Sequence, residues 1–168
     1  MDSLNEKLRA LVDQWQLTGL PGRQTLLDKA GELQDWKKTH EIPGLWVEPP
    51  GLVTATLDDA WGLGVQLIEQ YALILGMNVF PLGLEKSAQE IIASCHEIVP
   101  DYLGMTILQF DSEEDLSEIK RKIPDQTRLI VGGPVFLADP EMAQRVGVHF
   151  LAKDLIEFLN FFIPQPGS

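Results

Sequence analysis

The chain has 168 residues, of which 45% are apolar and 23% are charged. Such a length predicts one domain with at most a small appendage, and the apolar fraction suffices for a buried core, which excludes a mainly disordered chain. Asp and Glu number 25 against 13 Lys and Arg, giving a formal charge of −12 at pH 7. This balance argues against nucleic acid or an anionic membrane as the main partner, because both are bound through clustered cations.

Cysteine content and hydropathy narrow the class further. The single cysteine, Cys95, excludes an intrachain disulfide and a cysteine-built zinc site. The first ten residues lack the apolar run of a signal peptide, and no stretch reaches the length of apolar sequence that a membrane-spanning helix needs. We therefore expect a soluble, cytoplasmic protein.

Residues 1–46 predict a helical unit. Ser3 and Glu6 have the spacing of a capping box, and the apolar residues that follow recur on one helical face. Gly and Pro at 19–22 end this first helix, and a second is expected from about residue 23 to about residue 39. Two short helices cannot bury their apolar faces alone, so this unit is expected to pack on the remainder of the chain, residues 47–168.

From residue 52 the pattern changes to strands that alternate with helices. Strands are predicted at 52–57, 77–82, 102–108, 128–131 and 148–151. Helices are predicted at 61–75, 87–98, 112–123, 139–147 and 154–162. The alternation predicts an α/β protein: a flavodoxin-like, doubly wound five-stranded parallel sheet (Rossmann-like) preceded by a short N-terminal helical unit.

Glycine-containing loops follow the first and fourth predicted strands. They read Asp58-Asp59-Ala60-Trp61-Gly62-Leu63-Gly64 and Gly132-Gly133-Pro134. In doubly wound sheets, ligands bind beyond the carboxyl ends of the strands, and glycines let a ligand approach the backbone. Glycines are equally common as plain turn residues, and the third glycine of a dinucleotide-binding fingerprint is missing. These loops therefore mark the place to look for a ligand, without naming it.

Taken together, the loops resemble those of the cobalamin-binding domain family, which includes methionine synthase, methylmalonyl-CoA mutase and corrinoid methyl carriers. That family carries Asp-x-His-x-x-Gly after strand one, Ser-x-Leu at strand three and Gly-Gly after strand four. The matching residues here are Asp59-Ala60-Trp61-Gly62-Leu63-Gly64, Thr106-Ile107-Leu108 and Gly132-Gly133. The resemblance covers about residues 52–162. It implies a cobalamin or related corrinoid bound by Asp59, Trp61, Gly62, Gly64, Thr106, Leu108, Gly132 and Gly133.

One position departs from the family pattern. Trp61 stands where the family has the histidine that ligates cobalt, and an indole has no lone pair to give to a metal. The resemblance then implies a corrinoid held without a protein ligand to cobalt, either base-off or base-on, or another flat tetrapyrrole. Asp59 loses the imidazole it would orient and is left as a favoured helix N-cap residue. Thr106 keeps a hydroxyl where the family's serine meets the nucleotide tail.

Alternatives remain open beside this interpretation. Trp61 could itself fill the ligand slot, which would leave a degenerate cobalamin-binding fold that serves as a protein-interaction or regulatory module. A haem or tetrapyrrole sensor would need an axial ligand such as His96 or His149 facing the site. A response-regulator receiver has the same architecture, but the third strand here runs into Gln109 where the phospho-accepting Asp would stand.

No array of acid, base and nucleophile is evident, so catalysis by this chain alone is not indicated. We expect a corrinoid carrier or sensor that passes a methyl group or a signal to a separate protein, such as a methyltransferase or a regulatory protein. In methionine synthase a helical unit caps the corrin, and residues 1–46 are expected to form a cap-like unit of this kind. Its tryptophans, Trp15, Trp36 and Trp46, are expected mainly in the core.

Overall fold

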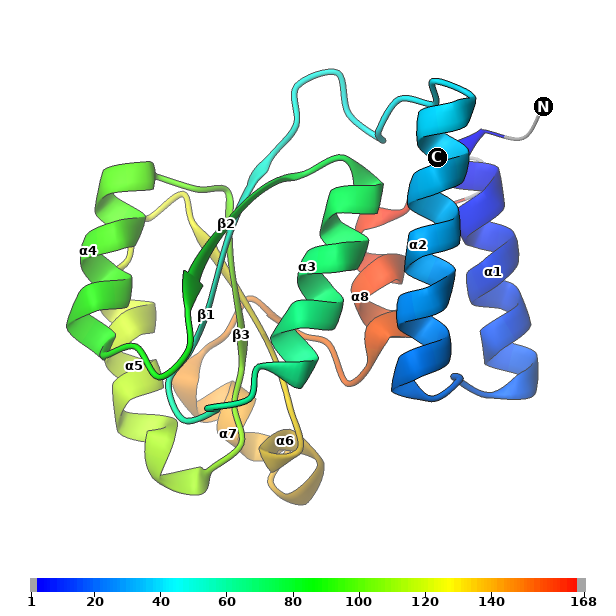
Figure 1. The fold of residues 1–168 in the computed structure, drawn as a ribbon. Coiled ribbons are helices and arrows are strands. Elements are labelled where there is room, and N and C mark those ends of the chain that lie inside the picture. Colours follow the sequence, from blue (N-terminus) through cyan, green and yellow to red (C-terminus); the bar gives the residue numbers. More distant parts are fainter. Residues whose placement is uncertain (1–2, 166–168) are drawn as a thin grey trace.

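The computed structural model describes residues 3–165, and its centre is a five-stranded parallel sheet (Figure 1). The strand order is β2-β1-β3-β4-β5, and all four neighbouring pairs are parallel. The strands are β1 (Gly51–Thr56), β2 (Asn78–Gly83), β3 (Tyr102–Thr106), β4 (Arg128–Gly132) and β5 (Phe150–Leu151). This confirms the predicted flavodoxin-like, doubly wound sheet, with the reversal in strand order between β1 and β3.

Helices cover both faces of the sheet. One face carries α3 (Leu63–Leu75) and α8 (Leu155–Phe162) (Figure 1). The other carries α4 (Ala88–Ile98), α5 (Glu113–Lys122) and α7 (Glu141–Val146). Two short helical segments were not predicted, a 3-10 turn η1 (Phe110–Ser112) and α6 (Val135–Ala138).

Successive residues of the strands point to opposite faces, so the two apolar cores divide along each strand. Leu52 and Ile130 belong to the core under α3 and α8. Val53 and Leu129 belong to the core under α4, α5 and α7. Both faces are therefore buried, which explains why the strands are almost continuously apolar.

Side-chain caps fix the starts of three helices. Ser3 and Glu6 form both hydrogen bonds of the predicted capping box of α1 (Leu4–Thr18). Ser87 caps α4 by accepting from the Glu90 N–H at 3.1 Å, and Asp154 caps α8. The helix expected from residue 139 begins instead at Glu141, and the carboxylate of Asp139 lies 2.7 Å from Arg145 Nη2.

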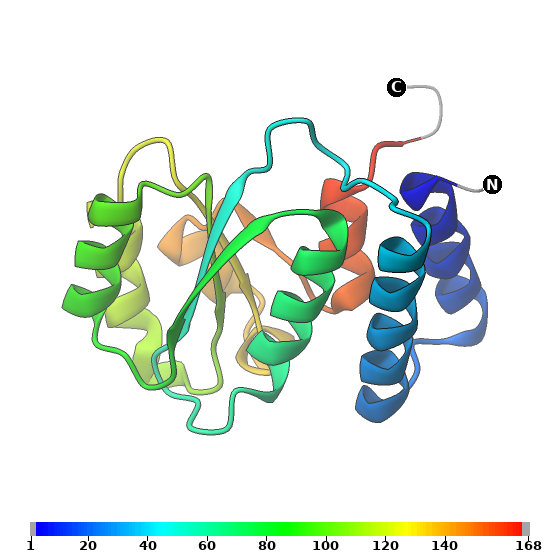
Figure 2. The same cartoon turned by 45° about the horizontal axis from the view of Figure 1, so that its top comes forward.

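The helical unit forms a third layer. Helices α1 and α2 (Arg23–Thr39) have the predicted extents and lie on the side of α3 and α8 that faces away from the sheet (Figure 2). The Tyr71 hydroxyl of α3 donates to the Leu26 carbonyl of α2 at 2.7 Å, and Arg9 of α1 donates to Asn160 of α8 at 2.7 Å. The unit therefore packs on the α/β part as expected, and it shares one apolar core with it.

The three tryptophans of residues 1–46 take part in this packing. Trp15 is buried and meets Tyr71 edge to face, whereas Trp36 and Trp46 are half-buried at the margin of the same core. The predicted boundary after residue 46 falls in the connection 40–50 between α2 and β1, which holds no helix or strand, and the division into two domains stays a prediction. Within residues 3–165, no helix combines the length and the apolarity that crossing a membrane requires.

Candidate functional site

A cavity of about 330 Å³ opens at the carboxyl edge of the sheet. The strands β1 and β3 end at this edge, in the lower part of Figure 1. The walls of the cavity are the first turns of α3, the ends of β3, β4 and β5, and the start of α8. Leu20, from the turn between α1 and α2, closes one side. We call this space the carboxyl-edge cavity. It lies at the edge of the sheet where ligands of this fold class bind.

Small residues keep this cavity open. A side chain at Gly64, in the first turn of α3, would begin 3.2 Å from Thr106 Cγ2 and press into the space. Gly104 on β3 places no side chain over the sheet, and the nearest atom to an added Cβ is Leu52 Cδ1 at 3.3 Å. The absence of side chains at these two positions leaves room between α3 and the strand ends.

Gly132 and Gly133 line the cavity, but their first role is in the packing of the strand ends. A Cβ on Gly132 would lie 2.8 Å from the carbonyl oxygen of Ala152, and one on Gly133 would lie 2.2 Å from that of Ile107. Gly133 also has a φ of 121°, which side-chain-bearing residues rarely adopt. Both glycines are therefore required by close backbone contacts, whatever the cavity holds.

Thr106 ends β3 in the wall of the cavity. Its Oγ1 is buried and has no hydrogen-bond partner among the described residues. A buried hydroxyl without a partner costs stability, and such groups in folded proteins are rare enough to need an explanation. A polar atom of a ligand in the carboxyl-edge cavity would supply the missing partner.

The loop after β1 is held by Asp59. This side chain is buried, and its Oδ1 accepts hydrogen bonds from the N–H groups of Trp61 at 2.9 Å and Gly62 at 3.0 Å. The expected role of Asp59 as N-cap of the following helix is wrong, because α3 has Gly62, with a left-handed φ of 69°, at its N-cap. Asp59 instead closes an Asx turn, in which its Oδ1 accepts from the N–H of Trp61, two residues further along the chain.

Trp61 does not fill the cavity. Its side chain is 84% exposed, and it is absent from the cavity wall. The alternative in which this indole occupies the ligand slot is therefore wrong. Other exposed apolar side chains also lie in the segments that follow the strand ends, and of these Leu108 lines the cavity. We call this set, together with Trp61, the apolar rim: Leu63, Leu108, Phe110 and Leu137.

Of the residues predicted from the sequence, five line the cavity: Gly64, Thr106, Leu108, Gly132 and Gly133. Asp59, Trp61 and Gly62 lie in the adjacent loop and not in the wall. Sequence reasoning missed Leu20 and Phe158, which come from segments far apart in the chain. No local pattern marks either of them, because each looks like an ordinary apolar helix or turn residue.

The histidines lie away from the cavity. His149 precedes β5, at the opposite edge of the sheet, and its Nδ1 accepts from the Leu129 N–H at 2.8 Å. Loss of hydration, with smaller effects of Lys120 and Arg128, lowers the pKa of this imidazole. His96 lies in the last turn of α4, with Nε2 2.6 Å from the Lys122 carbonyl. Neither imidazole faces the cavity, so neither His96 nor His149 is placed to serve as an axial ligand to a haem bound there.

The single cysteine, Cys95, is buried in the core under α4, α5 and α7. Burial raises the pKa of the Cys95 thiol to about 11, which leaves it protonated and inert at neutral pH. Residues 3–165 contain no cluster of three or more His, Cys, Asp or Glu side chains arranged to hold a metal ion.

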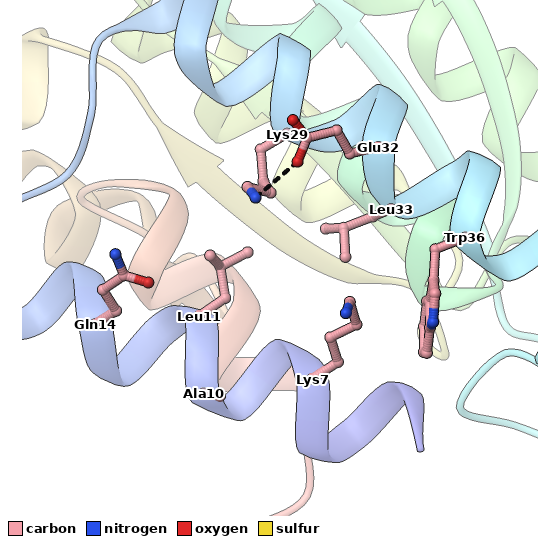
Figure 3. Close-up of a pocket in the computed structure, with 8 residues that line it drawn as sticks. All are labelled: Lys7, Ala10, Leu11, Gln14, Lys29, Glu32, Leu33 and Trp36. Atoms are coloured by element: carbon pink, nitrogen blue, oxygen red, sulfur yellow. Dashed lines mark hydrogen bonds and ion pairs between the residues drawn. The ribbon is translucent and has the colours of Figure 1, made fainter. Parts of the chain in front are cut away.

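A second cavity, of about 310 Å³, lies between α1 and α2 (Figure 3). Lys7 Nζ stands 4.7 Å from the ring centroid of Trp36, and Lys29 pairs with Glu32 at 2.7 Å. Buried Leu33 belongs to its wall. These cations are occupied by partners within the groove, and no polar side chain of its wall is both buried and unpaired.

No protein-family model and no curated protein matches the sequence. Solved structures do match. A cobalamin-binding protein from Desulfitobacterium hafniense DCB-2 superposes with a TM-score of 0.74 and 17% identity, over 94% of this chain and 75% of its own. The chain has the fold of a cobalamin-binding protein.

Two further solved structures share this fold. The monomethylamine corrinoid protein of Methanosarcina barkeri gives a TM-score of 0.64 at 14% identity, over 95% of this chain and 79% of its own. A chain of the methanol:cobalamin methyltransferase complex MtaBC, also from Methanosarcina barkeri, gives a TM-score of 0.55 at 16% identity. The match covers 96% of this chain and 70% of its own. Since more than nine-tenths of this chain is covered each time, the likeness includes the N-terminal helices.

Proposed function

We propose that this chain binds a corrinoid and acts as a carrier or sensor, without a protein ligand to cobalt. The observation that carries the proposal is the carboxyl-edge cavity, which is open, apolar and lined by the unpaired hydroxyl of Thr106. It lies in a fold shared with solved cobalamin-binding and corrinoid proteins.

The size of the cavity indicates which part of a corrinoid it would hold. At about 330 Å³ it is close to the lower limit of about 300 Å³ for small-molecule pockets, which is too little for a whole corrin macrocycle. The volume of the carboxyl-edge cavity suits one part of the corrinoid, its nucleotide tail. The macrocycle would then lie over the strand ends, on the apolar rim that includes Trp61 and Phe110.

Trp61 would lie in the loop below the macrocycle, at the position of the family's ligating histidine. An indole cannot coordinate a metal, but its exposed ring offers an apolar face to the corrin. Asp59 does not need an imidazole partner here, because the N–H groups of Trp61 and Gly62 occupy its Oδ1. The corrinoid would supply the metal-centred methyl or redox chemistry, while this chain would bind and orient it.

A carrier of this kind acts with another protein. One of the solved structures with this fold is a methanol:cobalamin methyltransferase complex, and we propose a methyltransferase or a regulatory protein as the partner. We also propose that residues 1–46 and 47–168 are separate units. In this arrangement the helical unit lies beside the cavity and contacts it through Leu20, so a cap over the corrin would require the unit to move.

Titration of the purified protein with hydroxocobalamin and methylcobalamin, followed by gel filtration, tests the proposal. We expect the protein fraction to keep the visible absorption of the corrinoid. Gly64→Leu, which fills the cavity from α3, is expected to abolish retention. Gly31→Leu is the matched control, because an added Cβ there meets no atom within 4 Å.

Failure of the wild-type protein to retain colour would overturn the corrinoid proposal. The degenerate fold that serves as a protein-interaction module would then be favoured. Equal retention by wild type and Gly64→Leu would locate binding elsewhere on the protein and contradict the assigned cavity.

A further inference from the structure

We infer that the contact between His149 and Leu129 is a pH-sensitive switch, which holds the edge strand β5 against β4 while the imidazole is neutral and is lost when the imidazole is protonated. The inference goes beyond the proposed function and does not depend on it. It assigns a conformational role to a histidine that lies outside the wall of the carboxyl-edge cavity.

Strand β5 has few attachments to the rest of the sheet. It spans only Phe150–Leu151 and, as the last strand in the order, it pairs with β4 alone. At its start the His149 N–H donates to the Leu129 carbonyl at 3.0 Å, and at its end the Ala152 N–H donates to the Val131 carbonyl at 2.9 Å. In so short a strand, each hydrogen bond to β4 is a large part of the attachment.

The side chain of His149 adds a further hydrogen bond to the same residue of β4. Its Nδ1 accepts from the Leu129 N–H at 2.8 Å, so His149 holds both backbone groups of Leu129. A backbone N–H can only donate, and Nδ1 must therefore be unprotonated, with the ring proton on Nε2. An imidazolium carries a proton on both nitrogens. Protonation of Nδ1 and this hydrogen bond consequently exclude each other.

The burial of Leu129 makes the loss of this hydrogen bond costly. Leu129 is fully buried, whereas His149 is exposed and open to protons from the solvent. A buried backbone N–H without an acceptor destabilises the structure around it. For water to replace the imidazole, it must enter between β4 and the start of β5. We therefore expect β5 to separate from β4 at this end.

Neighbouring charges act in the same direction. Loss of hydration, and then the cations Lys120 of α5 and Arg128 of β4, lower the pKa of His149. The Arg128 guanidinium lies 5.3 Å from the ring centroid of Phe161 on α8, and that ring stacks on Phe150 of β5 with centroids 4.4 Å apart. Protonated His149 would be a third cation at the start of β5. Its repulsion by the other two favours release of the strand.

Release of β5 would reach the carboxyl-edge cavity. Ala152, Lys153, Asp154 and Leu155 follow β5 directly, and all four line the cavity. Asp154 also caps α8 by accepting from the Glu157 N–H at 3.0 Å. A displaced β5 moves this wall, so the switch links the proton concentration to the shape of the cavity.

His96 supplies a matched control. Its Nε2 lies 2.6 Å from the Lys122 carbonyl oxygen. A carbonyl only accepts, so this nitrogen donates, and it still donates when the imidazole is protonated. Titration of His96 is therefore compatible with its contact, and titration of His149 is not.

Amide hydrogen exchange measured by NMR tests the switch on the protein without ligand, from neutral to mildly acidic pH. Protection factors, each relative to an unstructured amide at the same pH, are followed for Leu129 and residues 150–152. We expect them to fall about 3- to 10-fold, a fall complete below the pKa of His149 measured from its ring chemical shifts. His149→Asn, whose amide oxygen accepts without titrating, should show no such fall. His96→Asn should behave as wild type.

Constant protection of these amides while His149 titrates would overturn the inference, because water would then replace the ring without movement of the strand. Protection as high as that of Leu103, in the central strand β3, at the acidic end would also overturn it, since β5 would then leave only when the whole protein unfolds. An equal fall in His149→Asn and wild type would assign the effect to another group. Because no corrinoid is present, each of these results is independent of the proposed function.

Discussion

Asp58 accepts a hydrogen bond from the Ser112 hydroxyl at 2.7 Å and so joins the loop after β1 to the loop after β3. The same carboxylate accepts from the N–H groups of Leu108 at 3.0 Å and Gln109 at 2.9 Å. These bonds fix both loops beside the switch in strand order. Because Leu108 also lines the carboxyl-edge cavity, the shape of the cavity depends on Asp58.

Removal of this carboxylate is expected to loosen the cavity. Asp58→Ala leaves three donors without their acceptor. Hydrogen bonds to charged groups contribute about 1.5–3 kcal/mol each when buried, but water can reach the exposed N–H groups of Leu108 and Gln109, so we expect a total loss of about 2 kcal/mol in unfolding free energy. Urea denaturation measures it. Asp111→Ala removes an exposed carboxylate from η1, after β3, and is the control; it is expected to change stability by less than about 0.5 kcal/mol. Equal effects of the two substitutions would contradict the assigned role of Asp58.

Gly132, the last residue of β4, and Gly133, which follows it, give a graded prediction. At Gly132 a Cβ would lie 2.8 Å from the Ala152 carbonyl oxygen, and overpacking of this kind costs about 1–3 kcal/mol, so Gly132→Ala is expected to be destabilised by that amount. At Gly133 the clash is closer and the φ is positive, so Gly133→Ala is expected to be the less stable variant. The melting temperatures of the two variants, from thermal denaturation, provide the comparison. Gly31→Ala, in open space on α2, is expected to be neutral or slightly stabilised, and an equal melting temperature for all three would refute the argument.

The architecture was predictable because its signals are local. Ser3 with Glu6 marks a helix start within four residues, and the structure contains the predicted capping box. Strand ends were less accurate. The strand predicted to reach Leu108 ends at Thr106, because the Leu108 N–H is taken by Asp58 from a different loop. A contact between residues fifty apart in sequence has no local signature.

The cavity was predictable only in part, for the same reason. Loop motifs led to Gly64 in the first turn of α3 and to Thr106 and Gly132, the last residues of β3 and β4. Leu20 reaches the cavity only because α1 and α2 pack on α3 and α8, and that packing is set by apolar faces whose partners the sequence does not specify. The sequence also could not show whether Trp61 fills the cavity, because that depends on the direction of its side chain in the folded protein.

Stability is expected to fall on mild acidification because of His149. Reduced hydration, with Lys120 and Arg128 nearby, lowers the pKa of this imidazole in the folded protein below its ordinary value of 6.5. Between the two pKa values this histidine binds more protons in the unfolded chain than in the folded one. Its contribution to the free energy of unfolding is therefore complete above pH 6.5 and is lost as the pH falls through the pKa of the folded protein. Urea denaturation at a series of pH values from neutral to mildly acidic measures the loss.

The matched variant for this prediction is His149→Asn. An amide oxygen can replace Nδ1 as acceptor for the Leu129 N–H, and it does not titrate. We expect the variant to lose less stability than wild type over the same pH interval. An identical pH dependence in both proteins would show that another group causes the effect.

Trp61→His tests whether the loop after β1 places residue 61 beneath cobalt. The substitution restores a side chain that can coordinate a metal, and because Trp61 is 84% exposed, we expect stability to change by less than about 0.5 kcal/mol. Electron paramagnetic resonance of bound cob(II)alamin, with ¹⁵N-labelled histidine in the protein, provides the measurement. Nitrogen splitting in the variant should change with the label, and the wild-type spectrum should not. Trp61→Phe, which keeps an aromatic ring without a lone pair, should behave as wild type. A label-dependent wild-type spectrum would mean that another histidine binds cobalt, and an unresponsive Trp61→His would place this loop away from the metal.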